Sequence, residues 1–182
     1  MLKKIIINNS FIAMWHPRYD ETENDEESYK QIILAVANDI KKRGTISKEV
    51  FLNILDWKTP RLKGIVKLNN FRLYAAKIKK CLKVPEDQKL KILDDLYGIG
   101  APLASTILHF IYSDKFPIMD IRTVEPLYKS GYIKFISRDG KKYPAFKTAI
   151  LSIQRQSPRW NLRQIDRALF AFHKLNQKVK NC

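Results

Sequence analysis

Cysteine and histidine are scarce in this sequence, which contains two cysteines and three histidines among 182 residues. The two thiols, Cys81 and Cys182, lie far apart in the chain and cannot supply four ligands to a zinc site or an iron–sulfur cluster. They form no disulfide framework either, so we expect a protein of the reducing cytoplasm. Because the histidines are also scattered, we expect no catalytic metal and no cofactor.

Long apolar runs, internal repeats and low-complexity tracts are missing as well. Near the N-terminus, the apolar run Ile5–Ile7 is followed at once by Asn8, Asn9 and Ser10. Such a run is too short and too polar for a signal peptide or a membrane span. We therefore expect no membrane partner.

Acidic residues are the third shortage, with 18 Asp and Glu against 34 Lys and Arg and a formal net charge of +16. Six of the acids fall within Asp20–Glu27, which contains no Lys or Arg, so the rest of the chain is more basic still. A chain this basic favours a polyanionic partner, and nucleic acid is the natural one. Mere solubility is the alternative interpretation of the charge.

Apolar residues at three- and four-residue spacing predict an all-α protein. The expected helices are 25–43, 45–56, 70–82, 85–96, 101–112, 120–129, 145–154 and 162–177. Ser47 is a candidate N-cap, and Asn161 with Gln164 resembles a capping box. Residues 131–143 should form a loop or a small hairpin, and 57–61 a turn. The acidic run Asp20–Glu27 is expected to be a solvated segment that precedes and enters the first of these helices.

The most informative segment is Leu93–Leu108, in which Gly98 and Gly100 lie between two predicted helices. Gly98 can adopt a positive φ, and Gly100 lets the backbone approach closely. Amides at the start of the second helix point outward, where a phosphate can accept hydrogen bonds. The pattern predicts a helix-hairpin-helix motif at about 86–112 that binds the backbone of double-stranded DNA; the alternative is a hairpin used only for packing. The residues expected at the DNA backbone are Gly98, Ile99, Gly100, Ala101, Leu103 and Ala104.

This hairpin, followed by Phe116–Asp120, resembles the helix-hairpin-helix-GPD superfamily of base-excision DNA glycosylases. In that family an aspartate lies about twenty residues beyond the second hairpin glycine, at the start of a helix; here the spacing from Gly100 to Asp120 is 20. The resemblance is close over Leu90–Leu127 and looser elsewhere. It implies an all-α, two-lobed fold, with one lobe at about 45–130 and the other made of 1–44 and 131–182.

The chemistry that the resemblance implies gives Asp120 a role. Cleavage of an N-glycosidic bond develops positive charge on the deoxyribose, which a nearby carboxylate can stabilise while it orients or deprotonates a water molecule. The base must first be flipped out of the duplex. The alternative is that Asp120 is only an N-cap. The hairpin twenty residues earlier favours the catalytic interpretation, and the two roles can coexist.

The sequence departs from the family's lyases at Pro102, where they carry the lysine that forms a Schiff base. The resemblance therefore implies a monofunctional enzyme that uses water and leaves an abasic site in DNA. The family's four-cysteine cluster is absent too, and a monovalent cation at hairpin carbonyls is a possibility that the resemblance raises. The rival hypothesis is a non-enzymatic DNA-binding or adaptor protein on the same scaffold. We expect a monomer associated with the nucleoid in the cytoplasm.

Further residues are candidates for DNA or base-pocket contacts, and each has a structural alternative. The turn with Trp57, Lys58 and Arg61 could supply a wedge in the DNA or contacts to phosphates. The structural alternative is that this turn is anchored in the core. Arg122 could hold a phosphate or be solvated, and Tyr97 could stack on sugar or cover the hinge. Trp15 and His16 could line a base pocket or belong to a packed arm. His109 is interpreted as a core or boundary histidine.

Overall fold

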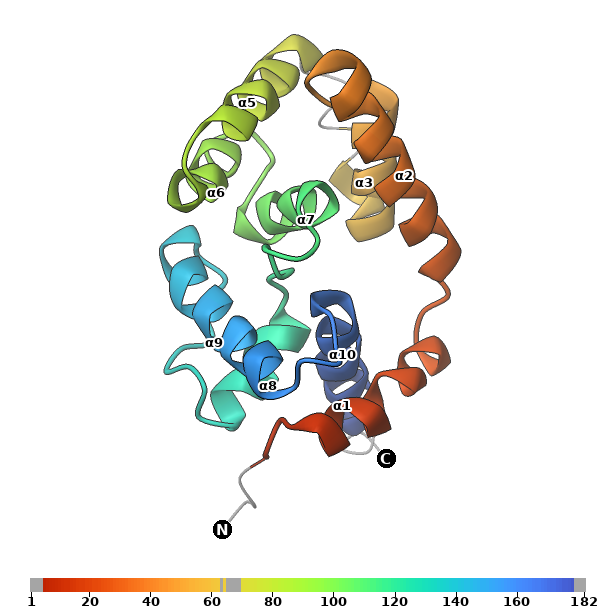
Figure 1. Cartoon of the computed structure of the whole chain (residues 1–182), viewed down its shortest axis with the longest axis vertical. Coiled ribbons are helices and arrows are strands. Elements are labelled where there is room, and N and C mark those ends of the chain that lie inside the picture. Colours follow the sequence, from red (N-terminus) through yellow and green to blue (C-terminus); the bar gives the residue numbers. More distant parts are fainter. Residues whose placement is uncertain (1–4, 63, 65–69, 179–182) are drawn as a thin grey trace. The chain divides into compact units, whose positions relative to one another are not determined.

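The computed structural model describes residues 5–62, 64 and 70–178, and within these ranges the protein is all-α (Figure 1). The described part contains nine α-helices, three short 3-10 helices and no strand. The α-helices are α1 (Asn9–Trp15), α2 (Glu26–Arg43), α3 (Lys48–Lys58), α5 (Phe71–Lys83), α6 (Glu86–Asp94), α7 (Ala101–Ile111), α8 (Ile121–Lys129), α9 (Tyr143–Gln156) and α10 (Leu162–Lys178). The expected all-α class is confirmed.

The chain divides into two compact units, with boundaries after Asn24 and after Tyr112. Unit 2, residues 25–112, holds α2, α3, α5, α6 and α7, while unit 1 holds α1, α8, α9 and α10. These boundaries differ from the expected lobes at 45–130 and 1–44 plus 131–182. The reason is packing: α2 lies against α3 and α7, whereas α8 lies against α10.

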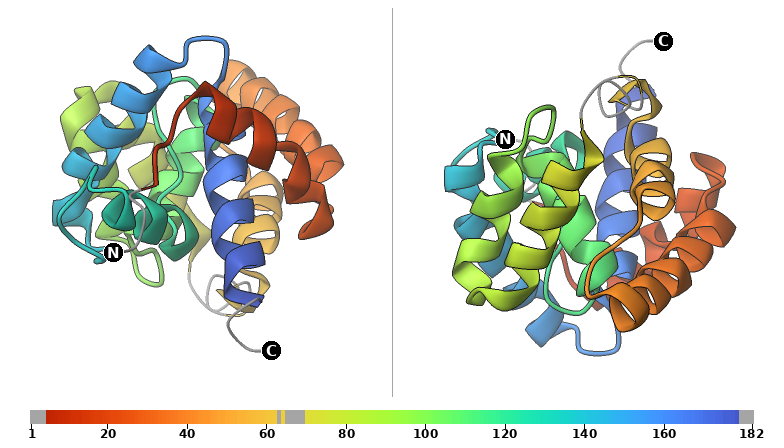
Figure 2. Two further views of the ribbon diagram at one scale, coloured as in Figure 1. Left: turned by 90° about the horizontal axis from the view of Figure 1, so that it is seen from below. Right: turned by 90° about the horizontal axis from the view of Figure 1, so that it is seen from above.

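In unit 2, helices end and begin where the local sequence signals predict. The helix α2 ends at Gly44, which adopts a left-handed conformation with a φ of 63°. Ser47 then caps α3, because its hydroxyl oxygen accepts a hydrogen bond from the Val50 amide at 3.3 Å. The helices α5 and α6 lie side by side, as Figures 1 and 2 show, and α7 packs against α6. Leu93 and Ile107 are fully buried in this core.

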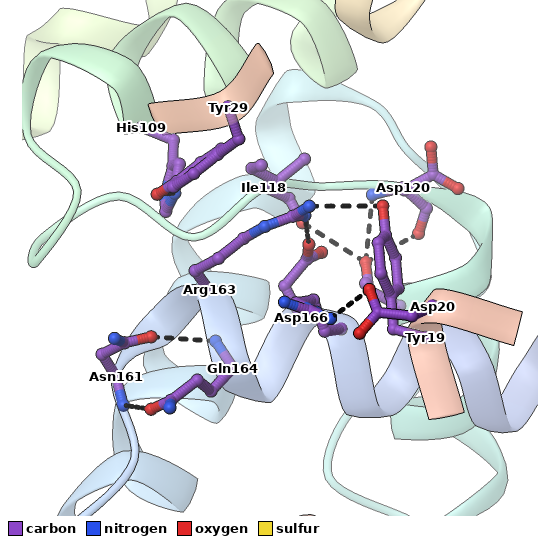
Figure 3. Close-up of polar contacts among 12 residues, drawn as sticks. Tyr19, Asp20, Tyr29, His109, Ile118, Asp120, Asn161, Arg163, Gln164 and Asp166 are labelled. Atoms are coloured by element: carbon purple, nitrogen blue, oxygen red, sulfur yellow. Dashed lines mark hydrogen bonds and ion pairs between the residues drawn. The ribbon is translucent and has the colours of Figure 1, made fainter. Parts of the chain in front are cut away.

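Unit 1 is built around α10, which packs against α1, α8, α9 and the 3-10 helix η1 (Pro17–Glu21). The apolar stripe of α10 faces the core: Leu162, Ile165, Ala168 and Leu169 are buried, and Phe172 is half-buried. The predicted capping box is also present. The Gln164 amide donates to the Asn161 side chain at 2.9 Å, and the Asn161 amide donates to the Gln164 side chain at 3.0 Å (Figure 3).

Two expectations about local structure were wrong. Residues 9–21 are helical although no helix was expected there, and Asn8 caps α1 by accepting from the Phe11 amide at 3.0 Å. Trp57 and Lys58 belong to the last turn of α3 rather than to a turn between helices, because Pro60 disfavours the helical region only from Thr59 onward. For residues 131–143 the loop alternative holds: residues 131–139 form a loop without a strand, and the 3-10 helix η3 (Gly140–Lys142) follows it.

Two acids of the acidic run, Asp20 and Glu23, are bound to α10, so this part of the run is not the solvated segment that was expected. The Asp20 carboxylate accepts from Arg167 at 2.6 Å, and Glu23 forms an ion pair with Lys174. Both cations lie on α10, so the acids hold η1 and the following residues against that helix. The acidic run therefore neutralises part of the positive charge of unit 1.

Candidate functional site

The hairpin turn between α6 and α7 has the backbone geometry that its glycines predict. The Ile99 amide donates to the Leu96 carbonyl oxygen at 2.9 Å and closes the turn. Gly98 has a φ of 77°, a conformation that costs a residue with a side chain about 1–2 kcal/mol. Gly98 is thus required by the fold of the turn itself.

Gly100 differs, because the chain does not require a glycine at that position. It is the N-cap of α7 with a φ of −93° and a ψ of 172°, which any residue adopts. A Cβ atom built there would meet only the Cδ atom of Pro102, at an ordinary contact distance of 3.7 Å. The space next to the Gly100 backbone is therefore open. Such open space is what an external group needs in order to approach the backbone closely.

The start of α7 presents fewer backbone donors than the sequence suggests. The amides of Leu103 and Ala104 both donate to the Gly100 carbonyl oxygen at 2.9 Å, and Pro102 has no N–H group. The amides of Gly98, Gly100 and Ala101 form no backbone hydrogen bond among the described residues. Of these three, the amides of Gly100 and Ala101 lie at the N-terminus of α7 and are the donors that a phosphate at that helix would meet.

The turn is supported from α5. The Tyr74 hydroxyl donates to the Tyr97 carbonyl oxygen at 2.9 Å, and Tyr74 itself is buried. The Tyr97 side chain, by contrast, is 72% exposed. An aromatic ring this exposed does not cover the hinge, so its position suits contact with a ligand.

Asp120 lies at the N-terminus of α8 and caps that helix. Its Oδ1 atom accepts from the Arg122 amide at 3.0 Å. The Asp120 amide donates to the Thr123 hydroxyl oxygen at 3.0 Å (Figure 3). These bonds complete a capping box. Asp120 as a whole residue is half-buried.

The segment before Asp120 is a buried, extended link. Phe116, Ile118 and Met119 are each at most 2% exposed. The Tyr143 hydroxyl donates to the Pro117 carbonyl oxygen at 2.9 Å and ties the link to α9. The carboxylate of Asp120 is therefore held on a rigid support, which a catalytic group needs.

Several of the other candidates for DNA or base-pocket contacts pack against side chains of the protein itself. Trp57 packs edge-on against Phe110, with ring centroids 5.1 Å apart, which favours its interpretation as a core anchor. Lys58 is half-buried in the last turn of α3, and Arg61 is exposed in the 3-10 helix η2 (Pro60–Leu62). The guanidinium of Arg122 lies 4.9 Å from the centre of the Phe170 ring. Lys58 and Arg61 remain candidates for phosphate contacts.

Trp15 and His16 belong to a packed arm in unit 1. Trp15 meets Phe172 edge-on at 5.1 Å, and His16 meets Trp160 edge-on at 5.7 Å. In unit 2, His109 is fully buried, and its Nε2 atom lies 2.9 Å from the Tyr29 hydroxyl oxygen. It is a core histidine, as the sequence suggests.

A buried polar cluster on α10 was not foreseen from the sequence (Figure 3). Arg163 donates to the Asp166 carboxylate at 2.8 Å and to the Tyr19 hydroxyl oxygen at 3.3 Å. The guanidinium groups of Arg163 and Arg167 lie 4.9 and 4.8 Å from the centre of the Tyr19 ring. The only signal in the sequence is two arginines beside the apolar stripe of α10, and their partners on η1, Tyr19 and Asp20, are more than 140 residues away.

Unit 2 contains a cavity of about 540 Å³ between α2 and α3. Asp25, Asp56 and Trp57 are among its lining residues, and Ile32 and Val50 form part of its apolar wall. Asp120 belongs to unit 1 and does not line this cavity.

Within the described residues, no group of three or more His, Cys, Asp or Glu side chains is arranged to hold a metal ion. Among those same residues, none of the helices has the length and apolar character needed to cross a membrane. Comparison of the chain with models of protein families, with curated proteins and with solved structures gives no match.

Proposed function

We propose that the chain is a monofunctional DNA glycosylase with the two-lobed fold of the helix-hairpin-helix-GPD superfamily. It hydrolyses the N-glycosidic bond of a damaged, mismatched or modified base in double-stranded DNA. The observation that carries this proposal is the placement of Asp120. A half-buried aspartate follows a buried, extended link at the start of α8, twenty residues after Gly100 in the sequence.

DNA binding is assigned to the hairpin turn. The amides of Gly100 and Ala101 can donate to one phosphate, and the open space at Gly100 lets that phosphate approach the backbone. The net charge of +16 supplies the remaining, salt-sensitive attraction. A monovalent cation at the hairpin carbonyls would add a phosphate contact but takes no part in the chemistry.

In the reaction, the Asp120 carboxylate stabilises the positive charge that develops on deoxyribose as the base departs. It also orients a water molecule, which attacks the sugar and leaves an abasic site. Pro102 has no amine, so no Schiff base forms at that position.

The test compares Asp120→Asn with wild type on a panel of duplexes that carry damaged, mismatched or modified bases. Asn is as good an N-cap as Asp, so the variant keeps α8 intact while removing the charge. We expect abasic-site formation by wild type and its loss in Asp120→Asn, with duplex affinity retained. Equal activity in both proteins would contradict the role. Borohydride should trap no covalent adduct, and a robust adduct would contradict monofunctional chemistry.

A second candidate is a non-enzymatic DNA-binding or adaptor protein on the same scaffold. The specific observation in its favour is the capping box, because it gives Asp120 a structural role without catalysis. This candidate predicts duplex binding through the hairpin and no base release from any duplex. In that case Asp120→Ala should lower stability by about 1 kcal/mol through loss of the cap and leave binding unchanged.

A further inference from the structure

A basic loop, residues 133–142, joins α8 to α9 in unit 1. It contains one acid, Asp139, and four exposed cations. The cations are Lys134, Arg138, Lys141 and Lys142. The loop is thus strongly positive although it is only ten residues long.

The four cations of the basic loop are not neutralised by the protein. Elsewhere in unit 1, Arg163, Arg167 and Lys174 are paired with carboxylates. The ion pairs formed among the described residues include none of the four loop cations. Positive charge is therefore concentrated at this loop, where a polyanion can meet it.

The loop has a defined conformation. The Asp139 side chain accepts from the Lys141 amide at 2.7 Å and so caps η3, while the Asp139 amide donates to the Ser137 hydroxyl oxygen at 3.1 Å. Its first residue, Ile133, and the residue that follows it, Tyr143, are both buried. A loop fixed at both ends loses little conformational entropy when it binds.

An apolar side chain projects among these charges. Ile136 is 45% exposed, between Lys134 and Arg138 in the sequence. The neighbouring Phe135 is half-buried, with the Lys142 ammonium 5.6 Å from its ring centre. An exposed isoleucine flanked by cations is the combination with which minor-groove proteins separate stacked bases while holding the adjoining phosphates.

We propose that the basic loop is a second DNA-binding element, in which Ile136 wedges between stacked base pairs and the four cations hold the flanking phosphates. The inference rests on the duplex binding of the proposed function but not on its chemistry. The residue that follows the loop, Tyr143, is held in a way that fits this role. Its ring stacks on that of Phe116 with centroids 6.5 Å apart, and its hydroxyl donates to the Pro117 carbonyl oxygen. Phe116 and Pro117 belong to the link that ends at Asp120, so the loop and the carboxylate share one rigid support.

The experiment measures unstacking and binding separately, with a duplex that contains 2-aminopurine, a base whose fluorescence rises when it is unstacked. At saturating protein, Ile136→Ala should lose most of the fluorescence increase while its affinity changes less than threefold. The matched control is Met14→Ala, also in unit 1, whose side chain is 63% exposed. It should behave as wild type.

The double variant Lys141→Ala/Lys142→Ala tests the phosphate contacts. If both lysines bind phosphates, the slope of log affinity against log salt concentration should fall in magnitude by roughly 1.8. The control is Lys41→Ala/Lys42→Ala, a second adjacent pair of exposed lysines with the same change in net charge. We expect that pair to leave the slope nearly unchanged.

Failure of the loop proposal and failure of the catalytic proposal give different results in these experiments. Unstacking that depends on Ile136, without base release from any duplex, would support the loop and contradict the glycosylase. Duplex binding with unchanged unstacking in Ile136→Ala, or equal slopes in the two lysine variants, would overturn the loop assignment alone. If wild type bound anionic lipid vesicles through Ile136 and bound no duplex, both proposals would fail.

Discussion

The hydroxyl group of Tyr74 on α5 donates a hydrogen bond to the carbonyl oxygen of Tyr97 in the hairpin turn, at a distance of 2.9 Å. Burial raises the pKa of Tyr74, and nearby Tyr97 raises it further, so the hydroxyl stays protonated and can donate. A residue in one helix thereby fixes the backbone of a turn 23 residues later. The turn that we assign to phosphate binding is therefore held by a buried residue of a second helix.

Replacing Tyr74 by phenylalanine should weaken both the fold and DNA binding. The variant removes one hydrogen bond and leaves the Tyr97 carbonyl group without that partner, which costs about 1 kcal/mol of unfolding free energy. Because the turn loses its support, we expect duplex affinity to fall severalfold. Urea unfolding and a duplex titration at fixed salt measure the two effects.

The control for Tyr74→Phe is Thr45→Val in the same unit. Its hydroxyl donates to the Ala75 carbonyl oxygen at 3.2 Å, so the variant also loses a long-range bond to α5. We expect a similar loss of stability with unchanged affinity. A matching loss of affinity in Thr45→Val would show that binding follows stability, not the turn.

Gly98→Ala should destabilise the protein, because residue 98 adopts a φ of 77°. The expected cost is about 1–2 kcal/mol. Gly44→Ala provides a matched control, since Gly44 has a φ of 63°, and an added Cβ atom would meet nothing within 4 Å. Both variants should lose stability in urea unfolding, and only Gly98→Ala should lose duplex affinity.

Gly100→Ala should keep most of its stability and lose duplex affinity. The backbone at residue 100 is in an ordinary region and has room for a methyl group, so stability should change by less than about 1 kcal/mol. The methyl group would occupy the space that a phosphate needs, so we expect duplex affinity to fall tenfold or more. Unchanged affinity in a folded Gly100→Ala protein would contradict phosphate binding at the start of α7.

The local features of the fold could be predicted from sequence because their causes are local. Periodic apolar residues and caps such as Ser47 and Asn161 define helices over a few turns. The hairpin turn follows the same rule, since its geometry depends on two glycines and their neighbours. The short helix α1 was missed because its seven residues provide too little periodicity.

Features that depend on distant partners could not be predicted in this way. Asp20 and Glu23 of the acidic run pair with Arg167 and Lys174, about 150 residues away, and nothing near these acids in the sequence indicates their partners. The division into units was misjudged for the same reason, since the packing of α2 and α8 depends on α7 and α10. For Asp120, the sequence raised both the capping and the catalytic role, and the geometry establishes the first.

The contact between α8 and α10 should make stability depend on pH through Glu125. Burial alone would raise the pKa of Glu125, but hydrogen bonds from His173 and Lys129 outweigh it and lower the pKa below its usual value. A carboxylate with a lowered pKa in the folded state stabilises the protein above its unfolded pKa, about 4.3. That stability is lost as the pH falls through the folded pKa.

Urea unfolding of Glu125→Gln at several pH values measures this contribution. The difference in stability from wild type should be largest near neutral pH and shrink as the pH falls below about 4. Glu49→Gln is the control, because Glu49 is exposed at the start of α3. A difference for Glu125→Gln that does not vary with pH would contradict the lowered pKa of Glu125 in the folded protein.

Cys81 should be chemically inert in the folded protein. Its side chain is fully buried, and burial raises the pKa of the thiol to about 11, although Lys89 acts in the opposite direction. Because only the thiolate reacts, labelling at pH 8 needs both exposure and ionisation. In a Cys182→Ser variant, which leaves Cys81 as the single thiol, we expect labelling by a thiol reagent to be at least a hundredfold slower than in urea-unfolded protein. Rapid labelling of the native variant would contradict the burial of Cys81 between α5 and α6.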